Sequence, residues 1–368
     1  MRQGGDRAKQ DGDRMRQGSV VFIGPDSEES SGGVASVMRS LRKSEILLEE
    51  WDIAEHPSCK DGSLQKRLCY SFAQYIRFTI CNERADICHI HISSYSSTWR
   101  KIMYAKTAKK KGMRVVFHVH GAEFDLFYSK CTRRQKRAIM TSFAAACRVI
   151  VLSESWKSFF CNELGLSNVV VLNNSVDCSL YEFSHGTPGS LSFVGQLGKR
   201  KGAYDLINAL SQIKLRGFSF TCVFAGDGET KQVRELAEDC GLSDMVSFTG
   251  WVDSGRVRCL LRDSSIMVLP SYHEGFPMSI IEAMAAGNAV VSTWRGGIPE
   301  ATCEDGRILI DAGDVDGLAD ALCLLLGNKQ LVSDMTEANR TFVKTRLDNR
   351  IVHQALSDIY SEVLHENC

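Results

Sequence analysis

Residues 263–300 read DSSIMVLPSYHEGFPMSIIEAMAAGNAVVSTWRGGIPE, and this stretch decides the fold expected for the whole chain. The apolar run 266–269, closed by a proline, is typical of a buried strand in a parallel sheet. A helix is predicted over 278–286, with Pro277 at its start and Gly287 at its end, before a second apolar run. Such a strand–loop–helix–strand unit places a helix N-terminus at the carboxyl edge of the sheet, where open α/β folds bind phosphate.

Two glutamates frame this unit. Glu274 lies in the loop before the predicted helix, and Glu282 lies inside it beside isoleucine, alanine and methionine. Two glutamates eight residues apart carry no signal by themselves, and a helical glutamate usually faces water. An acid with these apolar neighbours, however, needs a polar partner. The whole phrase EGFPMSIIEAMAAGNAVVST resembles the E-x7-E signature of the retaining glycosyltransferases of family 4, which have the GT-B fold.

The resemblance implies an α/β chain of two Rossmann-like domains that face each other across a cleft, with the nucleotide on the second. It implies transfer of a sugar from a UDP- or GDP-sugar to an acceptor hydroxyl, with retention of anomeric configuration. By the same resemblance, Glu282 binds the ribose hydroxyls and Glu274 contacts the sugar. Gly275, Phe276 and Pro277 would contact the donor at the start of the helix. A lipid-linked or growing bacterial cell-surface polysaccharide is the expected acceptor.

Composition limits the class of protein. The 368 residues suit two α/β domains, and the net charge is zero. Counted to Pro188, however, 27 Lys and Arg stand against 20 Asp and Glu, which leaves 17 against 24 for the remainder. The basic first part predicts a negatively charged partner. No apolar run approaches the 18 or so residues of a membrane-spanning helix, so a cytoplasmic protein is expected.

The 14 cysteines form no C-x-x-C pair, and no signal peptide is recognised before them. Buried thiols in a reduced cytosol are therefore expected, for example at Cys69, Cys88, Cys147 and Cys222, rather than disulfides or a zinc site.

The chain begins with a polar segment, residues 1–18, that repeats short phrases and is expected to be a disordered tail, with Met15 as an alternative start. A strand is predicted over 19–24, followed by a loop that ends in Gly32 and Gly33 before a helix. Glycines permit close backbone approach and a helix N-terminus attracts an anion, although an ordinary turn has the same pattern. The phrase GGVASV resembles the family's first glycine loop, which implies that Gly33 lies against the donor diphosphate.

Histidines alternate along two further predicted strands, 86–92 and 114–119. The spacing of His89, His91 and His118 permits a metal site, but no carboxylate stands nearby to complete it, so no metal is expected.

His120 differs because it follows its strand directly, and carboxyl ends of parallel strands face the ligand. The phrase HVHGAEFD resembles the family's His-Gly loop, which implies that His120 approaches the transferred sugar. A purely structural histidine is the other interpretation.

The second domain is predicted to begin at residue 187, within a linker-like stretch over 183–190. The boundaries expected are 19–186 for the acceptor domain, 187–348 for the donor domain and 349–368 for a terminal helix that crosses back.

The first turn of the second domain reads QLGKRKG. Lys201 and the glycine after it match the family's Lys-Gly, which implies that Lys201 binds the diphosphate and acts in catalysis. Gln196 stands where the family has an arginine, so one phosphate-binding cation is missing unless Lys199 or Arg200 replaces it. Because fixed cations and N–H groups take the place of a divalent ion, neither metal nor cofactor is expected.

Two basic runs in the first half comprise Arg100, Lys101, Lys106 and residues 109–111, then Arg133, Arg134, Lys136 and Arg137. They are either a solvated helix face or a surface for anionic lipid, and adsorption to a membrane is favoured. Nucleic acid is not expected, because no recognition motif accompanies the charges.

Three other functions would each have a sequence feature of their own. A dehydrogenase would need G-x-G-x-x-G after a first strand, and neither domain opens with it. A nucleotide-sugar epimerase of the same fold would use acid–base residues rather than the E-x7-E phrase. A protein that binds nucleotide sugars without turnover is the alternative that Gln196 favours.

Overall fold

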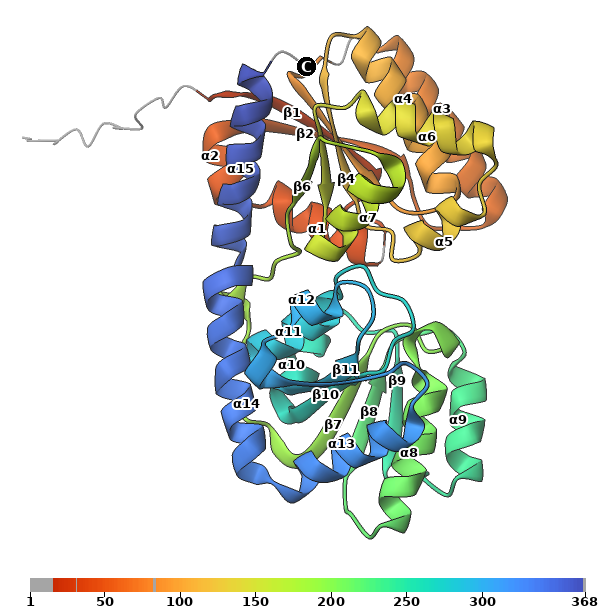
Figure 1. Cartoon of the computed structure of the whole chain (residues 1–368), viewed down its shortest axis with the longest axis vertical. Coiled ribbons are helices and arrows are strands. Elements are labelled where there is room, and N and C mark those ends of the chain that lie inside the picture. The colour runs from red at the N-terminus through yellow and green to blue at the C-terminus, as the bar shows by residue number, and fades with distance from the viewer. Residues whose placement is uncertain (1–15, 31, 82–83, 367–368) are drawn as a thin grey trace, which may run out of the picture.

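The computed structural model describes residues 16–30, 32–81 and 84–366, and in it two parallel six-stranded sheets stand end to end (Figure 1). The first, in the order β2-β1-β3-β4-β5-β6, contains β1 (Gly18–Pro25), β2 (Trp51–Cys59), β3 (Ile87–Ile92), β4 (Arg114–Val119), β5 (Arg148–Val151) and β6 (Val169–Val171). The second, in the order β12-β11-β10-β7-β8-β9, contains β7 (Thr187–Val194), β8 (Thr221–Ala225), β9 (Val246–Gly250), β10 (Ser264–Leu269), β11 (Ala289–Thr293) and β12 (Arg307–Ile310). Continuous apolar strands such as β10, buried at all six positions, suit parallel sheets covered on both faces.

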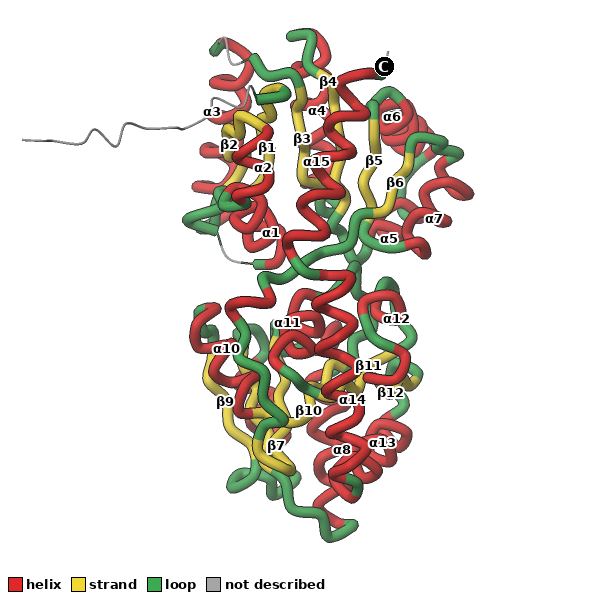
Figure 2. Tube along the Cα trace, turned by 90° about the vertical axis from the view of Figure 1, so that its left-hand side faces the viewer, coloured by secondary structure: helices red, strands yellow, loops and turns green. Residues whose placement is uncertain are grey.

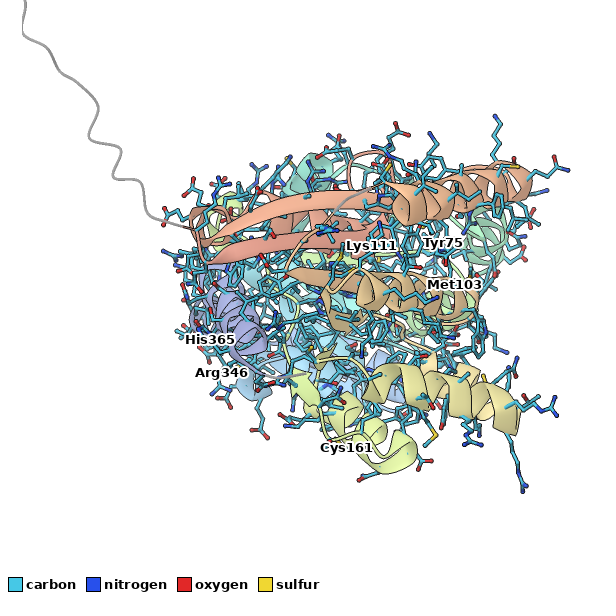
Figure 3. All side chains as sticks on the ribbon, turned by 90° about the horizontal axis from the view of Figure 1, so that it is seen from above. Tyr75, Met103, Lys111, Cys161, Arg346 and His365 are labelled. Carbon is cyan, nitrogen blue, oxygen red and sulfur yellow. The ribbon has the colours of Figure 1, made fainter. Side chains whose placement is uncertain are left out.

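Helices cover both faces of the first sheet. They are α1 (Gly33–Arg42), α2 (Glu45–Glu50), α3 (Leu64–Ile80), α4 (Ser96–Lys110), α5 (Phe124–Ser129), α6 (Arg133–Ala144) and α7 (Glu154–Leu164). Helices α3, α4 and α6 lie side by side on one face (Figures 1 and 3). Helices α1 and α2 lie on the other face together with the last helix, α15 (Asn349–His365) (Figure 2).

The second sheet carries α8 (Ala203–Leu215), α9 (Thr230–Asp239), α10 (Ser254–Asp263), α11 (Met278–Ala286), α12 (Ile298–Ala301), α13 (Val315–Gly327) and α14 (Lys329–Phe342). Helices α8, α9 and α13 pack on one side, and α10, α11 and α14 on the other (Figure 1). One buried cluster, which includes Phe193, Phe224 and Ile281, joins the sheet to these helices.

Helix α15 returns to the first domain. Its Leu356 and Tyr360 are buried in a first-domain cluster, and the indole N–H of Trp51 donates to Ser357 Oγ at 2.7 Å. Residues 343–347 form one π-turn that links α14 to α15.

The expected fold, an α/β chain with two Rossmann-like domains, is confirmed. Three details differ from expectation. The tail predicted over 1–18 is too long, since β1 begins at Gly18, while residues 1–15 lie outside the described part. Cys69 is exposed on α3, although the other three cysteines named above are buried, and no disulfide joins any of the thirteen described cysteines. Neither β2 nor α3 was predicted, because β2 contains a proline and alternates with polar residues, and α3 turns its apolar residues outward.

Candidate functional site

An ion pair lies where the two loops at the carboxyl ends of β7 and β10 meet. Lys201 Nζ contacts Glu274 Oε1, and the two side chains are only 13% and 6% exposed. Ser271 Oγ donates a second hydrogen bond to the same carboxylate oxygen at 2.8 Å. Gly202 permits this approach: its φ is +72°, and a Cβ there would lie 2.1 Å from the carbonyl oxygen of Pro270. Two residues that the sequence predicted for the site, the cation Lys201 and the acid Glu274, are thus in direct contact.

The neighbouring cations are arranged differently. Tyr272 N donates to Arg200 O at 2.8 Å, and Arg200 Nη1 donates to the carbonyl oxygen of His273 at 3.2 Å. Lys199 and Gln196 are both exposed. Arg200 therefore ties the two loops together, and Lys201 is the cation held inside them.

Two helices begin at the domain interface without a capping side chain. Helix α11 starts after Pro277, and no side chain accepts a hydrogen bond from its first N–H groups. Helix α1 starts at Gly33, likewise without a side-chain cap. Gly33 is exposed, and a Cβ added to it would meet nothing within 4 Å. Uncapped N–H groups can bind an anion, and packing within the protein does not require a glycine at 33.

The two domains touch at the loop that carries Gly275. A Cβ on this residue would lie 3.2 Å from the carbonyl oxygen of His120, at the end of β4 in the other domain. Gly297 N donates to Gly275 O at 3.0 Å, and Asn174 Nδ2 donates to Phe276 O at 2.9 Å. The structure therefore brings His120, Gly275 and the neighbouring Glu274 together, although they come from different domains.

A second contact between the domains involves Glu300. Its carboxylate accepts hydrogen bonds from Glu154 N at 2.6 Å and Ser155 N at 2.9 Å, in the first turn of α7. An anion is favourable at a helix N-terminus, so Glu300 stabilises the domain arrangement. The sequence pattern does not reveal this contact, since α7 is about 150 residues away in the chain.

Four imidazoles lie in a row on one face of the first sheet. His91 Nδ1 is 2.9 Å from His120 Nε2, and His89 Nε2 is 3.2 Å from His118 Nδ1. His89 Nδ1 lies 2.5 Å from the hydroxyl of Tyr360 on α15. Burial lowers the pKa of His120 and of His89 to about 3, and those of the other two fall well below their usual value. All four rings are therefore neutral at pH 7.

The same row contains the group that spacing alone would allow to bind a metal. One nitrogen each of His89, His91 and His118 lies within 4.8 Å of the others. The group contains no carboxylate or thiolate, so a divalent ion there would lack charge compensation in a buried site. The absence of a metal stays an expectation.

Glu282 lies on α11, half-buried, next to Tyr181 and Arg258. Burial raises the pKa of this carboxyl to about 7, although the Tyr181 hydroxyl and the Arg258 charge oppose the rise. The polar partner expected for Glu282 is thus a tyrosine from the segment between the domains. The carboxyl changes its charge near neutral pH.

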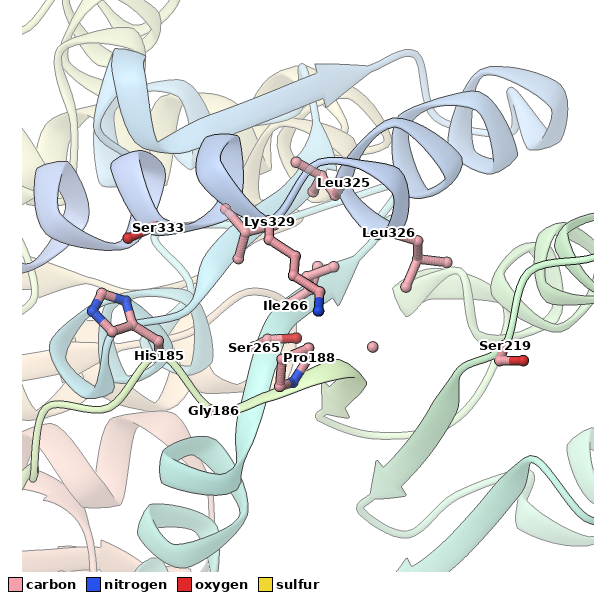
Figure 4. Close-up of a pocket in the computed structure, with 12 residues that line it drawn as sticks. His185, Gly186, Pro188, Ser219, Ser265, Ile266, Leu325, Leu326, Lys329 and Ser333 are labelled. Atoms are coloured by element: carbon pink, nitrogen blue, oxygen red, sulfur yellow. The ribbon is translucent and has the colours of Figure 1, made fainter.

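A cavity of about 410 Å³ lies elsewhere in the second domain (Figure 4). Its lining includes His185, Ser219, Ser265 and Lys329, at the amino-terminal edge of the sheet and beside α13 and α14. Parallel sheets bind their ligands at the carboxyl edge, so this cavity is not the expected site.

The expected basic surface needs one correction. Lys101 is 1% exposed, its Nζ donates to Ser58 Oγ, and burial lowers its pKa to about 7. The other cations of the two runs are at least partly exposed. None of the helices in the described part of the chain is long and apolar enough to cross a bilayer.

Comparisons with known proteins agree with this geometry. Residues 37–180 match the model of Glycosyltransferase Family 4, and residues 183–342 match that of Glycosyl transferases group 1. Glycogen synthase of Mycobacterium tuberculosis is 28% identical over 203 residues, 53% of this chain and 49% of that protein. The GDP-mannose:cellobiosyl-diphosphopolyprenol alpha-mannosyltransferase of Xanthomonas oryzae is 25% identical over 244 residues, 64% and 63% of the two chains.

The fold has solved counterparts as well. Sucrose-phosphate synthase from Thermosynechococcus elongatus superposes with a TM-score of 0.76 over 94% of this chain and 98% of that one, at 15% identity. The chain spans about half the length of the first relatives it matches, glycogen synthase among them.

Proposed function

Since the chain belongs to the family 4 glycosyltransferases of the GT-B fold, we propose that it transfers a sugar from a UDP- or GDP-sugar to an acceptor hydroxyl, with retention of anomeric configuration. The observation that carries this proposal is the Lys201–Glu274 pair, at the start of α11 and across the interface from His120. In the reaction, the bond from the anomeric carbon to the diphosphate breaks and a bond to the acceptor oxygen forms. The enzyme must stabilise an oxocarbenium-like sugar and the negative charge that develops on the diphosphate.

Each site residue has a role in this proposal. Lys201, the N–H groups that open α11 and the backbone at Gly33 bind the diphosphate, because a cation and uncapped helix N-termini favour negative charge. Glu282 accepts hydrogen bonds from the ribose hydroxyls. Glu274 contacts the sugar, and His120 supports its reacting face as a neutral group. Neither a metal nor a cofactor takes part.

We expect the acceptor to be lipid-linked or a growing polysaccharide. One relative named above acts on a diphosphopolyprenol, by its name, and the first domain of this chain carries the basic helices. Contact with the inner face of an anionic membrane is part of the same proposal. No role for nucleic acid is proposed.

The test is turnover with a panel of UDP- and GDP-sugars, measured by nucleotide release, with proton NMR of the product to determine its anomeric configuration. Release that depends on an acceptor and yields a product of the donor's configuration supports the proposal, and an inverted product contradicts retention. Tight binding of a donor without turnover would favour the alternative function, binding without catalysis, which the exposed Gln196 suggests. Conversion of the donor without an acceptor would favour an epimerase.

A further inference from the structure

Helix α3 presents an apolar stripe to solvent. Leu64, Leu68, Phe72, Ile76 and Ile80 are spaced four residues apart, and they are 71%, 62%, 66%, 41% and 76% exposed. Residues at this spacing lie on one side of a helix and wind slowly around it. Soluble monomers rarely expose a contiguous apolar surface of this kind without a partner.

The packing of α3 does not account for the stripe. Only Ser71 and Phe78 of its 17 residues are buried, and Tyr75 makes a hydrogen bond of 3.1 Å to Thr107 on α4. The outer surface continues onto α4 through Met103, which is 47% exposed and lies near Tyr75 (Figure 3). The helix is held by its inner side, and its apolar side faces outward.

The charge of the helices around the stripe indicates what kind of partner covers it. The three neighbouring helices α3, α4 and α6 contain no Asp or Glu. They carry twelve cations: Lys66, Arg67 and Arg77 on α3, Arg100, Lys101, Lys106, Lys109 and Lys110 on α4, and Arg133, Arg134, Lys136 and Arg137 on α6. All of these except Lys101 are at least partly exposed. A face of this composition attracts a negatively charged partner that also accepts apolar side chains.

We propose that the face formed by α3, α4 and α6 adsorbs to an anionic lipid bilayer, with the α3 stripe inserted at the level of the headgroups. A bilayer interface satisfies both features, since apolar side chains enter the acyl boundary and cations bind the headgroups. A second copy of the chain would bring like charges together, and a nucleic acid would leave the apolar stripe in water. This proposal deepens the membrane contact proposed above and rests on it, but adsorption is measurable without turnover.

The experiment is co-sedimentation of the full chain with vesicles of phosphatidylcholine alone or with about one third phosphatidylglycerol. Binding is expected only to the anionic vesicles and should weaken as salt rises. The triple variant L68Q/F72Q/I76Q should bind at least roughly tenfold more weakly, because three insertions of apolar side chains are lost. The triple variant R133Q/R134Q/R137Q should weaken binding by roughly fivefold per charge.

A matched control uses apolar side chains equally exposed on the other domain. Leu215 and Leu324 are 85% and 53% exposed, and L215Q/L324Q should bind vesicles like the wild type. Equal binding to both vesicle types, unchanged binding of the α3 variant, or a dimer in sedimentation velocity that the α3 variant abolishes would overturn the proposal. Loss of turnover in any of these proteins would bear on the proposed function alone.

A second, independent inference concerns the imidazole row. His91 Nε2 and His118 Nε2 are buried and have no hydrogen-bond partner among the described residues. A buried N–H without a partner is rarer than a buried lone pair without one, so each of these rings carries its proton on Nδ1. His91 then donates to His120 Nε2, and His118 donates to His89, whose own proton points to Tyr360.

We infer that His91 is a positioning residue that holds the proton of His120 on Nδ1. A neutral imidazole has one donor and one acceptor, and the acceptor of His120 is occupied by His91. His120 therefore presents an N–H to a ligand, as a hydrogen-bond donor rather than a base.

The test is nitrogen NMR of protein labelled with ¹⁵N-histidine. The wild type should show His120 protonated on Nδ1, the form that is minor in free histidine. In His91→Asn the amide Nδ2 replaces the donor, so the tautomer and kcat should be largely kept. In His91→Leu the hydrogen bond that favours the Nδ1–H form of His120 is lost, so the fraction protonated on Nδ1 should fall below that of the wild type, and kcat should fall with little change in KM.

Protonation of His120 on Nε2 in the wild type would overturn the inference, and this measurement needs neither variant to fold. The same fraction of Nδ1-protonated His120 in His91→Leu as in the wild type would overturn it as well. Because the spectra are recorded without substrate, their outcome is separate from that of the proposed function.

Discussion

The outer helices of the two domains cover similar sheets but carry opposite charge. Helices α3, α4 and α6 of the first domain contain only basic charged residues, whereas α8, α9 and α13 of the second contain six acids: Asp205, Glu235, Glu238, Asp239, Asp316 and Asp320. Some of these acids are paired with neighbouring cations, as Asp320 is with Arg216 and Glu235 with Lys231. The same architecture therefore carries two differently charged outer surfaces, and only that of the first domain suits an anionic partner.

At the inner edges of the domains, where they face each other, the charged side chains lie on the second domain instead of the first. The first domain presents the neutral His120, whereas the second presents the buried Lys201–Glu274 pair and Glu282 with its pKa near 7. Fixed charge at the inner edge thus belongs to the domain proposed to bind the diphosphate. The fold alone determines neither the charge of the outer helices nor that of the inner edges, because side chains can vary while the sheet stays the same.

The largest effect is expected where the charge of the second domain is removed. Lys201→Ala should weaken nucleotide-sugar binding roughly 10- to 150-fold, since a charge-assisted hydrogen bond contributes about 1.5–3 kcal/mol. It should also lower the free energy of unfolding by about 3–5 kcal/mol, because Glu274 is left buried and unpaired. Calorimetric titration and thermal unfolding measure the two effects.

The double variant K201A/E274Q is the control for the Lys201 experiment. It should recover most of the stability, since no charge is left unpaired, but not the affinity. Wild-type affinity in Lys201→Ala would mean that another cation binds the diphosphate and that the alignment of this loop is wrong.

A smaller effect is expected from pH. Ionised Glu282 is proposed to accept the ribose hydroxyls, so nucleotide affinity should fall roughly tenfold between pH 8 and pH 6 as a carboxyl with a pKa of about 7 is protonated. Glu282→Gln should bind weakly at every pH and show only the dependence that comes from the phosphate. The same raised pKa predicts that this carboxyl destabilises the fold increasingly from its unfolded pKa up to about pH 7, so the variant gains stability relative to wild type as pH rises. A wild-type affinity independent of pH would remove Glu282 from the ribose site.

The first domain can be tested at its glycine loop. Gly33→Ala should keep or slightly raise stability, by up to about 1 kcal/mol, because alanine favours a helix and the Cβ meets nothing. Binding of a nucleotide diphosphate sugar should nevertheless weaken roughly tenfold, equivalent to about 1.4 kcal/mol. Binding of the nucleoside monophosphate serves as the control and should change less. Unaltered binding of both would place the diphosphate away from α1.

A gain is expected at the exposed Gln196. Gln196→Arg should tighten nucleotide binding about fivefold, since an added exposed ionic contact contributes up to about 1 kcal/mol. The gain should shrink at higher salt. Weaker binding, or a gain that salt does not reduce, would speak against a phosphate near this turn.

No effect is expected from chelation. Because Lys201 and backbone N–H groups are proposed to bind the phosphates, turnover should survive excess EDTA, and the purified protein should contain less than one equivalent of zinc. Activity lost with EDTA and restored by magnesium or manganese would overturn the metal-free mechanism. One equivalent of bound zinc would instead indicate a metal site at His89, His91 and His118.

The sequence by itself determined the elements that build the site. The unit over 263–300, the Lys201–Gly202 turn and the glycine start of α1 are local patterns, in which a few neighbouring residues decide backbone conformation. Apolar runs between such turns predicted individual strands, whereas the two Rossmann-like domains were expected from the resemblance to a known family. The H-x-H spacing on both strands also contained the signal that His91 and His120 share a face of the sheet, but that spacing was considered only for a metal site, which was not expected.

Only the tertiary structure decided which distant groups meet. The contact of His91 with His120 depends on the register of β3 against β4, and the bond from Glu300 to α7 depends on how two domains are placed. The exposure of the apolar residues of α3 could not be predicted from the sequence either, because apolar residues at helical spacing normally indicate a buried side of a helix. Local pattern fixes conformation within a few residues, whereas these features follow from packing between segments that the chain separates by tens to hundreds of positions.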